Sequence, residues 1–317
     1  MNGMDAGTRA ALVAAREAGR GTIRKWRHGD AHRMLETVFA DCAAEDAEAL
    51  THRATRLFGD GGWAGALLQP LIDAIAADPL FEPPFKANRD GLRIGAVLFD
   101  CPAVAISACV TSAAAMRRRP PPTACTFSGR ITVTRFVRAG GATLRRWRTA
   151  PAGPDFRAAE APPCEERESL RLADGEVHAI DGRCEAQLLA DAGNDVVTLV
   201  ATIRAGAAPL MREHAIGDGK LLRVASGDDQ ASRAEMLLAF LRLAGRADAG
   251  PQFDAATRDP AFHLRWAAMR EWLALDAHAA LPRLEAMAAG DPHIEIREAA
   301  ERTLAAVRPR LSTACRA

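Results

Sequence analysis

The segment of the sequence with the most potential for chemistry is a short basic run that contains one aromatic residue. It comprises Arg145, Arg146, Trp147 and Arg148, directly after Leu144. If the run is a strand, Arg145 and Trp147 share one face, while Arg146 shares the other with its neighbours at 144 and 148. A guanidinium in a β-domain can bind an anion or pair with a carboxylate, and we favour pairing with Glu165, Glu166 or Glu168. Any ligand here is expected to be an anionic small molecule held by Arg145 or its strand neighbours.

A second candidate site combines carboxylates with imidazoles. Its members are Glu176, His178, Glu213 and His214. Strand alternation places Glu176 and His178 on one face, and imidazole nitrogen with carboxylate oxygen suits divalent iron or zinc. The same residues can also be solvated positions beside turns, because alternation alone does not make four ligands converge. The sequence therefore favours no cofactor, with a site for divalent iron or another divalent metal as the alternative.

The overall charge and the cysteine pattern argue against several classes of protein. With 41 Lys and Arg against 40 Asp and Glu, the net charge is +1, so nucleic acid and membrane surfaces are not expected partners. Seven widely spaced cysteines do not form a secreted disulfide framework, and reduced thiols are expected. The first residues lack the apolar core of a signal peptide, and no run of about 18 apolar residues could span a bilayer. We expect a bacterial cytoplasmic protein.

Three segments with different periodicities must position these side chains. Residues 6–77 have apolar positions at helical spacing and end before the prolines at 79, 83 and 84. Short β-compatible runs follow, and helical spacing returns from residue 228, as in 232–243. We therefore expect an N-terminal helical region at 1–90, a β-domain at 91–227 and a C-terminal helical region at 228–317.

The central segment predicts about eight short antiparallel strands separated by turns. The clearest is 131–137, where apolar and polar residues alternate strictly, and 92–99 with 103–110 predicts a hairpin. Further strands are expected at 144–148, 166–172, 176–180, 183–189 and 196–203, and a second hairpin at 211–224. Such close spacing predicts a sandwich or small barrel, which makes the fold class α+β.

The C-terminal segment contains a repeat with a period of 32 residues. Asp259-Pro260 aligns with Asp291-Pro292, Arg265 with Arg297, and the double alanines at 267–268 and 299–300 coincide. The pattern resembles the HEAT-like helical repeat over 259–307, a family whose usual role is protein contact. We expect Asp259 and Asp291 to cap equivalent helices and the arginines to join neighbouring repeats through these carboxylates. We also expect Trp266, Leu273 and Leu275 to face the preceding helix or the β-domain rather than solvent.

The β-segment resembles the cupins, in particular the cysteine-dioxygenase-like branch with helices before the barrel. The resemblance rests on strand 131–137, the turn at Gly140-Gly141 and the stretch 172–180. It implies a His-x-His metal pair on the next strand, where Arg145 and Trp147 stand instead. It also implies a later histidine near 185–189, where the polar candidates are Glu185 and Gln187. A guanidinium cannot ligate a metal at neutral pH, so the resemblance predicts the fold without the usual metal site.

These observations lead to one favoured function and one alternative. The favoured hypothesis is a cytoplasmic, non-catalytic or regulatory protein that combines a metal-ligand-poor cupin-like domain with a HEAT-like tail. Its ligand candidates are Arg145, Arg146, Trp147 and Gln187. The expected partners are a protein that contacts the C-terminal helices and an anionic small molecule. The alternative is a cupin-type, dioxygenase-like metal-dependent enzyme with substituted ligands.

Overall fold

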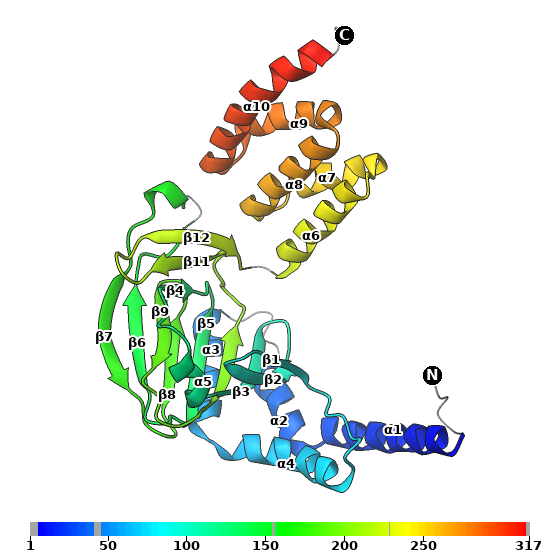
Figure 1. The fold of residues 1–317 in the computed structure, drawn as a ribbon, viewed down its shortest axis with the longest axis vertical. Helices are drawn as coiled ribbons and strands as arrows, with labels where there is room; N and C mark the ends of the chain where they lie inside the picture. The colour runs from blue at the N-terminus through cyan, green and yellow to red at the C-terminus, as the bar shows by residue number, and fades with distance from the viewer. Residues whose placement is uncertain (1–5, 41–45, 154–155, 228, 315–317) are drawn as a thin grey trace. The chain divides into compact units, whose positions relative to one another are not determined.

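The computed structural model describes residues 6–40, 46–153, 156–227 and 229–314 and shows an α+β protein with helices at both ends and antiparallel sheets between them (Figure 1). This confirms the predicted fold class. The chain divides into two compact units. The first contains Met1–Cys125, Arg130–Arg148 and Glu165–Ala207; the second contains Thr126–Gly129, Thr149–Cys164 and Ala208–Ala317. The three-part division expected from the sequence stays a prediction.

The N-terminal helices belong to the first unit. They are α1 (Ala6–Arg27), α2 (Asp30–Val38), α3 (Ala47–Gly59) and α4 (Gly62–Ala77). Asp46 is the N-cap residue of α3, because its Oδ1 accepts the backbone N–H of Ala49 at 2.8 Å. Trp26 Nε1 donates to the carbonyl oxygen of Leu67 at 2.7 Å, which ties α1 to α4. None of the described helices combines the length and apolar composition that a bilayer crossing requires.

Two antiparallel sheets form the β-region of the first unit. The larger has the order β1 (Lys86–Arg89), β2 (Arg93–Asp100), β3 (Val104–Thr111), β10 (Val196–Ile203), β5 (Ile131–Arg138) and β8 (Val177–Asp181). The smaller has the order β7 (Glu165–Arg171), β6 (Thr143–Arg148) and β9 (Glu185–Ala190), which lie side by side in green in Figure 1. A short helix, α5 (Ala113–Arg118), follows β3. Gly140, at φ +60°, turns the chain from β5 to β6, where a Cβ would collide with the carbonyl of Asn194.

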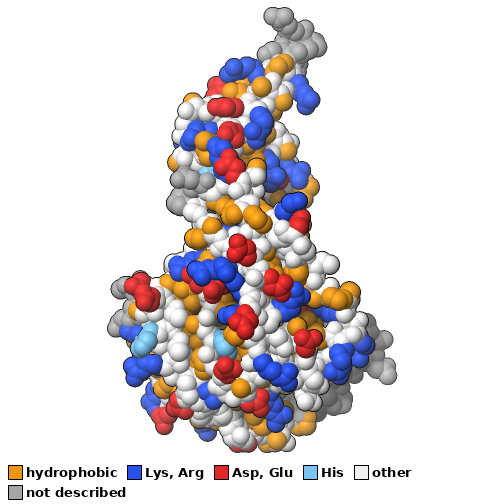
Figure 2. Space-filling view, turned by 90° about the vertical axis from the view of Figure 1, so that its left-hand side faces the viewer, with side chains coloured by type: hydrophobic (Ala, Val, Ile, Leu, Met, Phe, Trp, Pro, Cys, Tyr) orange, Lys and Arg blue, Asp and Glu red, His pale blue; other side chains and the backbone are white. Residues whose placement is uncertain are grey.

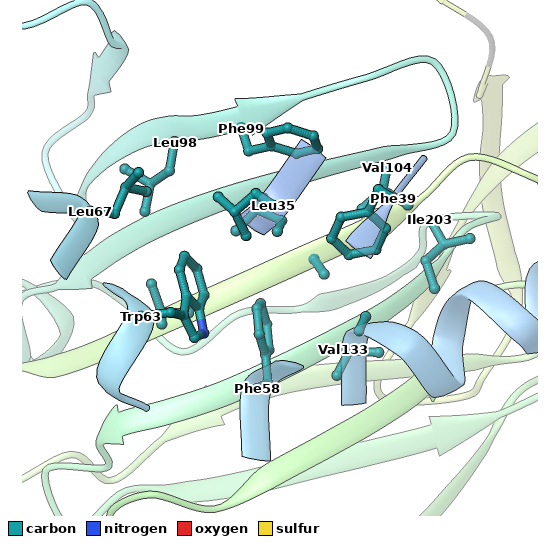
Figure 3. Close-up of a cluster of buried hydrophobic side chains, with 14 of the residues drawn as sticks. Leu35, Phe39, Phe58, Trp63, Leu67, Leu98, Phe99, Val104, Val133 and Ile203 are labelled. Atoms are coloured by element: carbon teal, nitrogen blue, oxygen red, sulfur yellow. The ribbon is translucent and has the colours of Figure 1, made fainter. Parts of the chain in front are cut away.

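One face of the larger sheet forms the main hydrophobic core with the N-terminal helices. Val133, Leu199 and Ile203 point from the sheet into this core, where they meet Leu35 and Phe58 from the helices. Figure 3 shows Leu35 and Phe58 from the helices beside Val133 and Ile203 from the sheet. Because successive side chains alternate across a strand, the residues between these apolar positions point to the opposite face.

The second unit contains a small sheet and a helical region. Its elements are β4 (Ala124–Phe127), which begins in the first unit, η2 (Ala158–Glu160), β11 (Leu210–Ala215), β12 (Leu221–Ser226), α6 (Asp229–Leu243), η3 (Ala247–Ala249), α7 (Gly250–Ala256), α8 (Phe262–Leu275), α9 (Ala277–Gly290) and α10 (Ile294–Ala314). The helices share a core around Phe253, Met269, Trp272 and Leu284. Trp266, Leu273 and Leu275 pack against this core, as predicted.

The 32-residue register is visible in the helical region. Helices α8 and α10 begin at equivalent positions, and Arg265 forms a bidentate ion pair with Asp291 at 2.7 and 2.9 Å. This confirms the predicted link between repeats. The predicted capping role of Asp259 is wrong by two residues: Ala261 is the N-cap residue of α8, and Asp259 instead accepts the N–H of Ala261 before the helix begins. Asp291 accepts the N–H of His293 in the same way.

The surface charges and the cysteines can be compared with the expectations from the sequence. Figure 2 shows basic and acidic side chains interspersed on the visible face, as a net charge of +1 allows. Among the described residues, Cys101, Cys109 and Cys184 are free thiols. Cys42 and Cys315 lie outside the described residues.

Candidate functional site

The pairing of β6 with β9 decides which side chains of the basic run face the interior. In this register Leu144 lies opposite Leu189 and Arg146 lies opposite Gln187, with no shift along the pair. Directly opposed residues of antiparallel strands point to the same face. Leu144, Leu189 and Gln187 all line a cavity of about 650 Å³. Arg146 therefore lies on the same face of the smaller sheet, but it lines a second, smaller cavity rather than this one.

The opposite wall of this cavity is the inner face of the larger sheet. Its lining includes a row of hydroxyl groups from three adjacent strands: Ser107 of β3, Thr198 of β10, and Thr132 and Thr134 of β5. Phe136 adds an aromatic surface beside them. Both sheets thus line one cavity, so the β-region is a sandwich of two sheets. The walls of the cavity also include apolar side chains and the exposed charged residues Lys86, Asp90 and Arg93.

A second cavity, of about 470 Å³, lies between β8 and the smaller sheet and shares Leu144 with the first. Its charged and polar lining residues are Arg146, Arg148, Arg167, Glu168, His178 and Glu185. Three guanidinium groups face two carboxylates here, so the lining has a basic excess even with a neutral histidine. Arg146 Nε donates to the carbonyl oxygen of Glu168 at 3.1 Å. This bond orients the guanidinium group and leaves Nη1 and Nη2 for other partners.

His178 and Glu176 form a pair at the margin of this cavity. His178 lies opposite Thr134 in the β5–β8 register and therefore points toward the interior. Its Nε2 lies 3.2 Å from Glu176 Oε1, and its ring packs edge-on against Phe136. The pKa of Glu176 lies below its usual value, mainly because the backbone N–H of Ala173 donates to the carboxylate and also because His178 bonds to it. The carboxylate can therefore orient the imidazole.

Three buried polar atoms in this region have no hydrogen-bond partner among the described residues. They are Gln187 Oε1, Trp147 Nε1 and His178 Nε2, which approaches Glu176 Oε1 to 3.2 Å. A buried carbonyl oxygen without a donor is unusual in a folded protein, because desolvation is not offset by a new bond. Gln187 lines the larger cavity, where a ligand could supply the missing donor.

Of the four predicted ligand residues, Arg145 is placed differently from the others. Its Nε and Nη2 donate to Glu166 Oε1 at 3.0 and 2.7 Å, and its guanidinium group lies 4.8 Å from the centre of the Trp147 ring. The predicted pairing with a glutamate is confirmed for Arg145. Because it alternates with Leu144 and Arg146, Arg145 lies on the face away from the cavity. Arg146 and Trp147, which is only 1% exposed, line the smaller cavity, whereas Arg145 lines neither of the two cavities.

The four candidate metal ligands divide between the two units. Glu176 and His178 lie together in the first unit, whereas Glu213 pairs with Arg223 and His214 Nδ1 donates to the carbonyl of Gly219 in the second. In the described part of the chain, no three His, Cys, Asp or Glu side chains are grouped so that they could hold a metal. Arg146, which lies on the inner face of the smaller sheet, is a guanidinium donor and does not fit a metal ion.

The hydroxyl-bearing residues of the larger cavity are not among the site residues predicted from the sequence. The alternation of Thr132 and Thr134 in the clearest predicted strand was a usable signal, because a polar face opposite an apolar one can mark a ligand cavity. Ser107 and Thr198 could not be added to them from sequence, since they meet only through the strand order β3-β10-β5.

Comparisons with known proteins give only weak likenesses. No family model matches the sequence, and no curated protein matches it. Solved structures with a TM-score of 0.25 include a 7S globulin of Momordica charantia at 13% identity, covering 41% of this chain and 35% of that one. The structure of the DMSP lyases RdDddP and RnDddQII has the same score at 16% identity, and the match covers 62% of this chain and 94% of that one. Fe(II)-HppE with the alternative substrate (S)-1-HPP also has this score at 12% identity, and the match covers 58% of this chain and 96% of that one. This chain spans about a third of the globulin chain, and scores of this size decide neither its fold nor its function.

Proposed function

We propose that the β-sandwich is a cupin-like, non-catalytic domain that binds a small organic anion through Arg146, without a metal ion. The observation that carries the proposal is the state of Arg146. It shares the cavity face with Gln187, and among the described residues no carboxylate forms an ion pair with it. Arg146 is half-buried, and a guanidinium with free donors beside a cavity suits a carboxylate or phosphate.

The surroundings of Arg146 support an anionic rather than a cationic ligand. Arg148 and Arg167 line the same cavity and increase the local positive potential. Glu168 contributes its backbone carbonyl to Arg146, so its side chain does not neutralise the guanidinium there. His178, oriented by Glu176, adds an imidazole that can donate to an anion when protonated.

The predicted regulatory role follows if ligand binding in the sandwich changes a protein contact elsewhere in the chain. The C-terminal helices, with their HEAT-like register, are the proposed contact region for that protein. This role, the cytoplasmic location and the alternative of a metal-dependent enzyme with substituted ligands all remain proposals. Near-stoichiometric iron, zinc or manganese in protein purified without chelator would favour the enzyme.

Matched arginine variants test the binding proposal. Thermal unfolding of the full chain is measured with hexanoate, gluconate, inorganic phosphate and glucose 6-phosphate. At least one organic anion should raise the unfolding midpoint of wild-type protein and of Arg145→Ala, but not of Arg146→Ala, because a ligand at 100 times Kd stabilises by about 2.7 kcal/mol. Equal midpoint shifts in both variants, or none with any anion in wild-type protein, would contradict the proposal.

A further inference from the structure

We infer that the anion bound by the sandwich is a carboxylate that carries several hydroxyl groups, and that Gln187 binds a hydroxyl close to the carboxylate. This inference rests on the proposed function and adds the chemical class of the ligand. It depends on three features of two cavities that share Leu144: the unpartnered Gln187 oxygen and the hydroxyl row in the larger one, and the donors left on Arg146 in the smaller one.

Gln187 is placed to accept a hydrogen bond from the part of the ligand beside its anionic group. It lies directly opposite Arg146 across the β6–β9 pair, and such partners have Cβ atoms about 5 Å apart on one face. The Gln187 Oε1 atom is buried without a hydrogen-bond donor among the described residues. A ligand whose carboxylate binds Arg146 would satisfy this oxygen if it carried an O–H or N–H group nearby.

The cavity lining favours a hydroxyl over an ammonium group. Ser107, Thr132, Thr134 and Thr198 supply hydroxyl groups that can both donate and accept. The carboxylate in this lining belongs to Asp90, whose Oδ1 already accepts the N–H groups of Leu92 and Arg93. An ammonium group would lose its hydration here without a free carboxylate to replace it, whereas a polyhydroxylated chain would find matching partners.

The remaining donors of Arg146 favour a carboxylate over a phosphate. Because Nε is bonded to Glu168 O, the guanidinium group offers the Nη1 and Nη2 pair. Two parallel N–H groups match the two oxygens of a planar carboxylate in a bidentate arrangement. The other basic side chains that line the two cavities, Arg148, Arg167, Lys86 and Arg93, are exposed, so we expect them to attract an anion at long range rather than to add direct bonds for a phosphate.

Isothermal titration of the full chain with four six-carbon probes tests this inference. Gluconate carries a carboxylate and hydroxyls, hexanoate a carboxylate, glucitol hydroxyls, and glucose 6-phosphate hydroxyls with a phosphate. We expect gluconate to bind about tenfold or more tightly than hexanoate and glucose 6-phosphate, and glucitol not to bind measurably. Gln187→Leu should weaken gluconate about three- to tenfold and leave hexanoate unchanged, as expected for one neutral hydrogen bond.

Two further variants serve as controls for Gln187→Leu. Gln69→Leu makes the same change at an exposed position of α4 and should leave gluconate binding unchanged. If Gln187→Leu does not fold, Thr134→Val removes one lining hydroxyl without altering the shape of the side chain, and it should weaken gluconate selectively. Hexanoate binding as tightly as gluconate, or glucose 6-phosphate binding more tightly, would overturn the inference and leave the anion site standing. Failure of every anion to bind would overturn the proposed function itself.

Discussion

Two arginines, one in each unit of the chain, show how differently a guanidinium can be used. In the helical region, Arg265 is 7% exposed and its bonds run to both carboxylate oxygens of Asp291 and to the carbonyls of Asp259 and Pro260. In the sandwich, Arg146 makes one bond to a backbone carbonyl beside a cavity. The first group is saturated and structural, whereas the second retains donors for a ligand. The two arginines carry the same charge, and they differ in how many guanidinium N–H groups remain without a partner.

The largest expected effect comes from breaking the saturated pair. Asp291→Ala should lower the free energy of unfolding by about 3–5 kcal/mol, because it leaves the buried Arg265 charge without its partner. Denaturant unfolding of the wild-type and variant chains measures this value. The double variant Arg265→Met with Asp291→Ala should be more stable than Asp291→Ala alone, since no unpaired charge remains. A loss below about 1 kcal/mol for Asp291→Ala would mean that Arg265 is not structural.

A pH dependence should arise from His214 in the same unit. Burial lowers the pKa of His214 below the ordinary 6.5, even though its Nδ1 donates to Gly219 O. The unfolded chain therefore takes up the proton first as pH falls through about 6.5, and stability is lost below that pH and unaffected above it. His214→Asn should flatten the fall in unfolding free energy between pH 7 and pH 5. An unchanged pH profile in this variant would show that other groups dominate.

A smaller effect is expected at the helix caps, where the two units can be compared directly. Asp46 caps α3 in the first unit and Asp276 caps α9 in the second, each by accepting the N–H three residues later. Either change to alanine should cost about 1 kcal/mol. Asp259→Asn serves as a control outside the N-cap position. Denaturant midpoints that moved more for Asp259→Asn than for Asp276→Ala would contradict the observed boundaries of α8 and α9.

The smallest effect is expected for the exposed pair of the sandwich. Arg145 and Glu166 have side chains that are 33% and 47% exposed. Arg145→Ala should therefore change the free energy of unfolding by about 1 kcal/mol or less. Measured by denaturant unfolding, a larger loss would give Arg145 a structural role and weaken its use as a control for Arg146.

The sequence was sufficient to predict most of the elements but not the interior face of β6. Strict alternation at Ile131 to Val137 marked β5, and the 32-residue register placed Arg265 against Asp291. In β6, however, both faces of the strand carry a buried apolar residue, Leu144 on one and Trp147 on the other. Alternation therefore did not identify the cavity side. That side is set by the pairing with β9, which lies some 40 residues further along the chain. The edge strand β1 was missed because Lys86–Arg89 is fully exposed and carries no apolar pattern.

The site was predictable only in part, for the same reason. Arg146 and Gln187 were both candidates, yet their juxtaposition depends on one register of an antiparallel pair, in which a slip of one residue would reverse every side chain. The hydroxyl row of Ser107, Thr134 and Thr198 requires the order β3-β10-β5, which joins strands distant in the chain.

The most direct test of the binding role of Arg146 is isothermal titration of gluconate into metal-free protein. Wild-type protein and Arg145→Ala should bind one equivalent with the same Kd. Arg146→Ala should bind about ten to a hundred times more weakly, as expected from the loss of charge-assisted hydrogen bonds, while its unfolding midpoint without ligand stays close to that of wild type. Equal affinities of the two variants, or binding that requires an added divalent metal, would contradict the account.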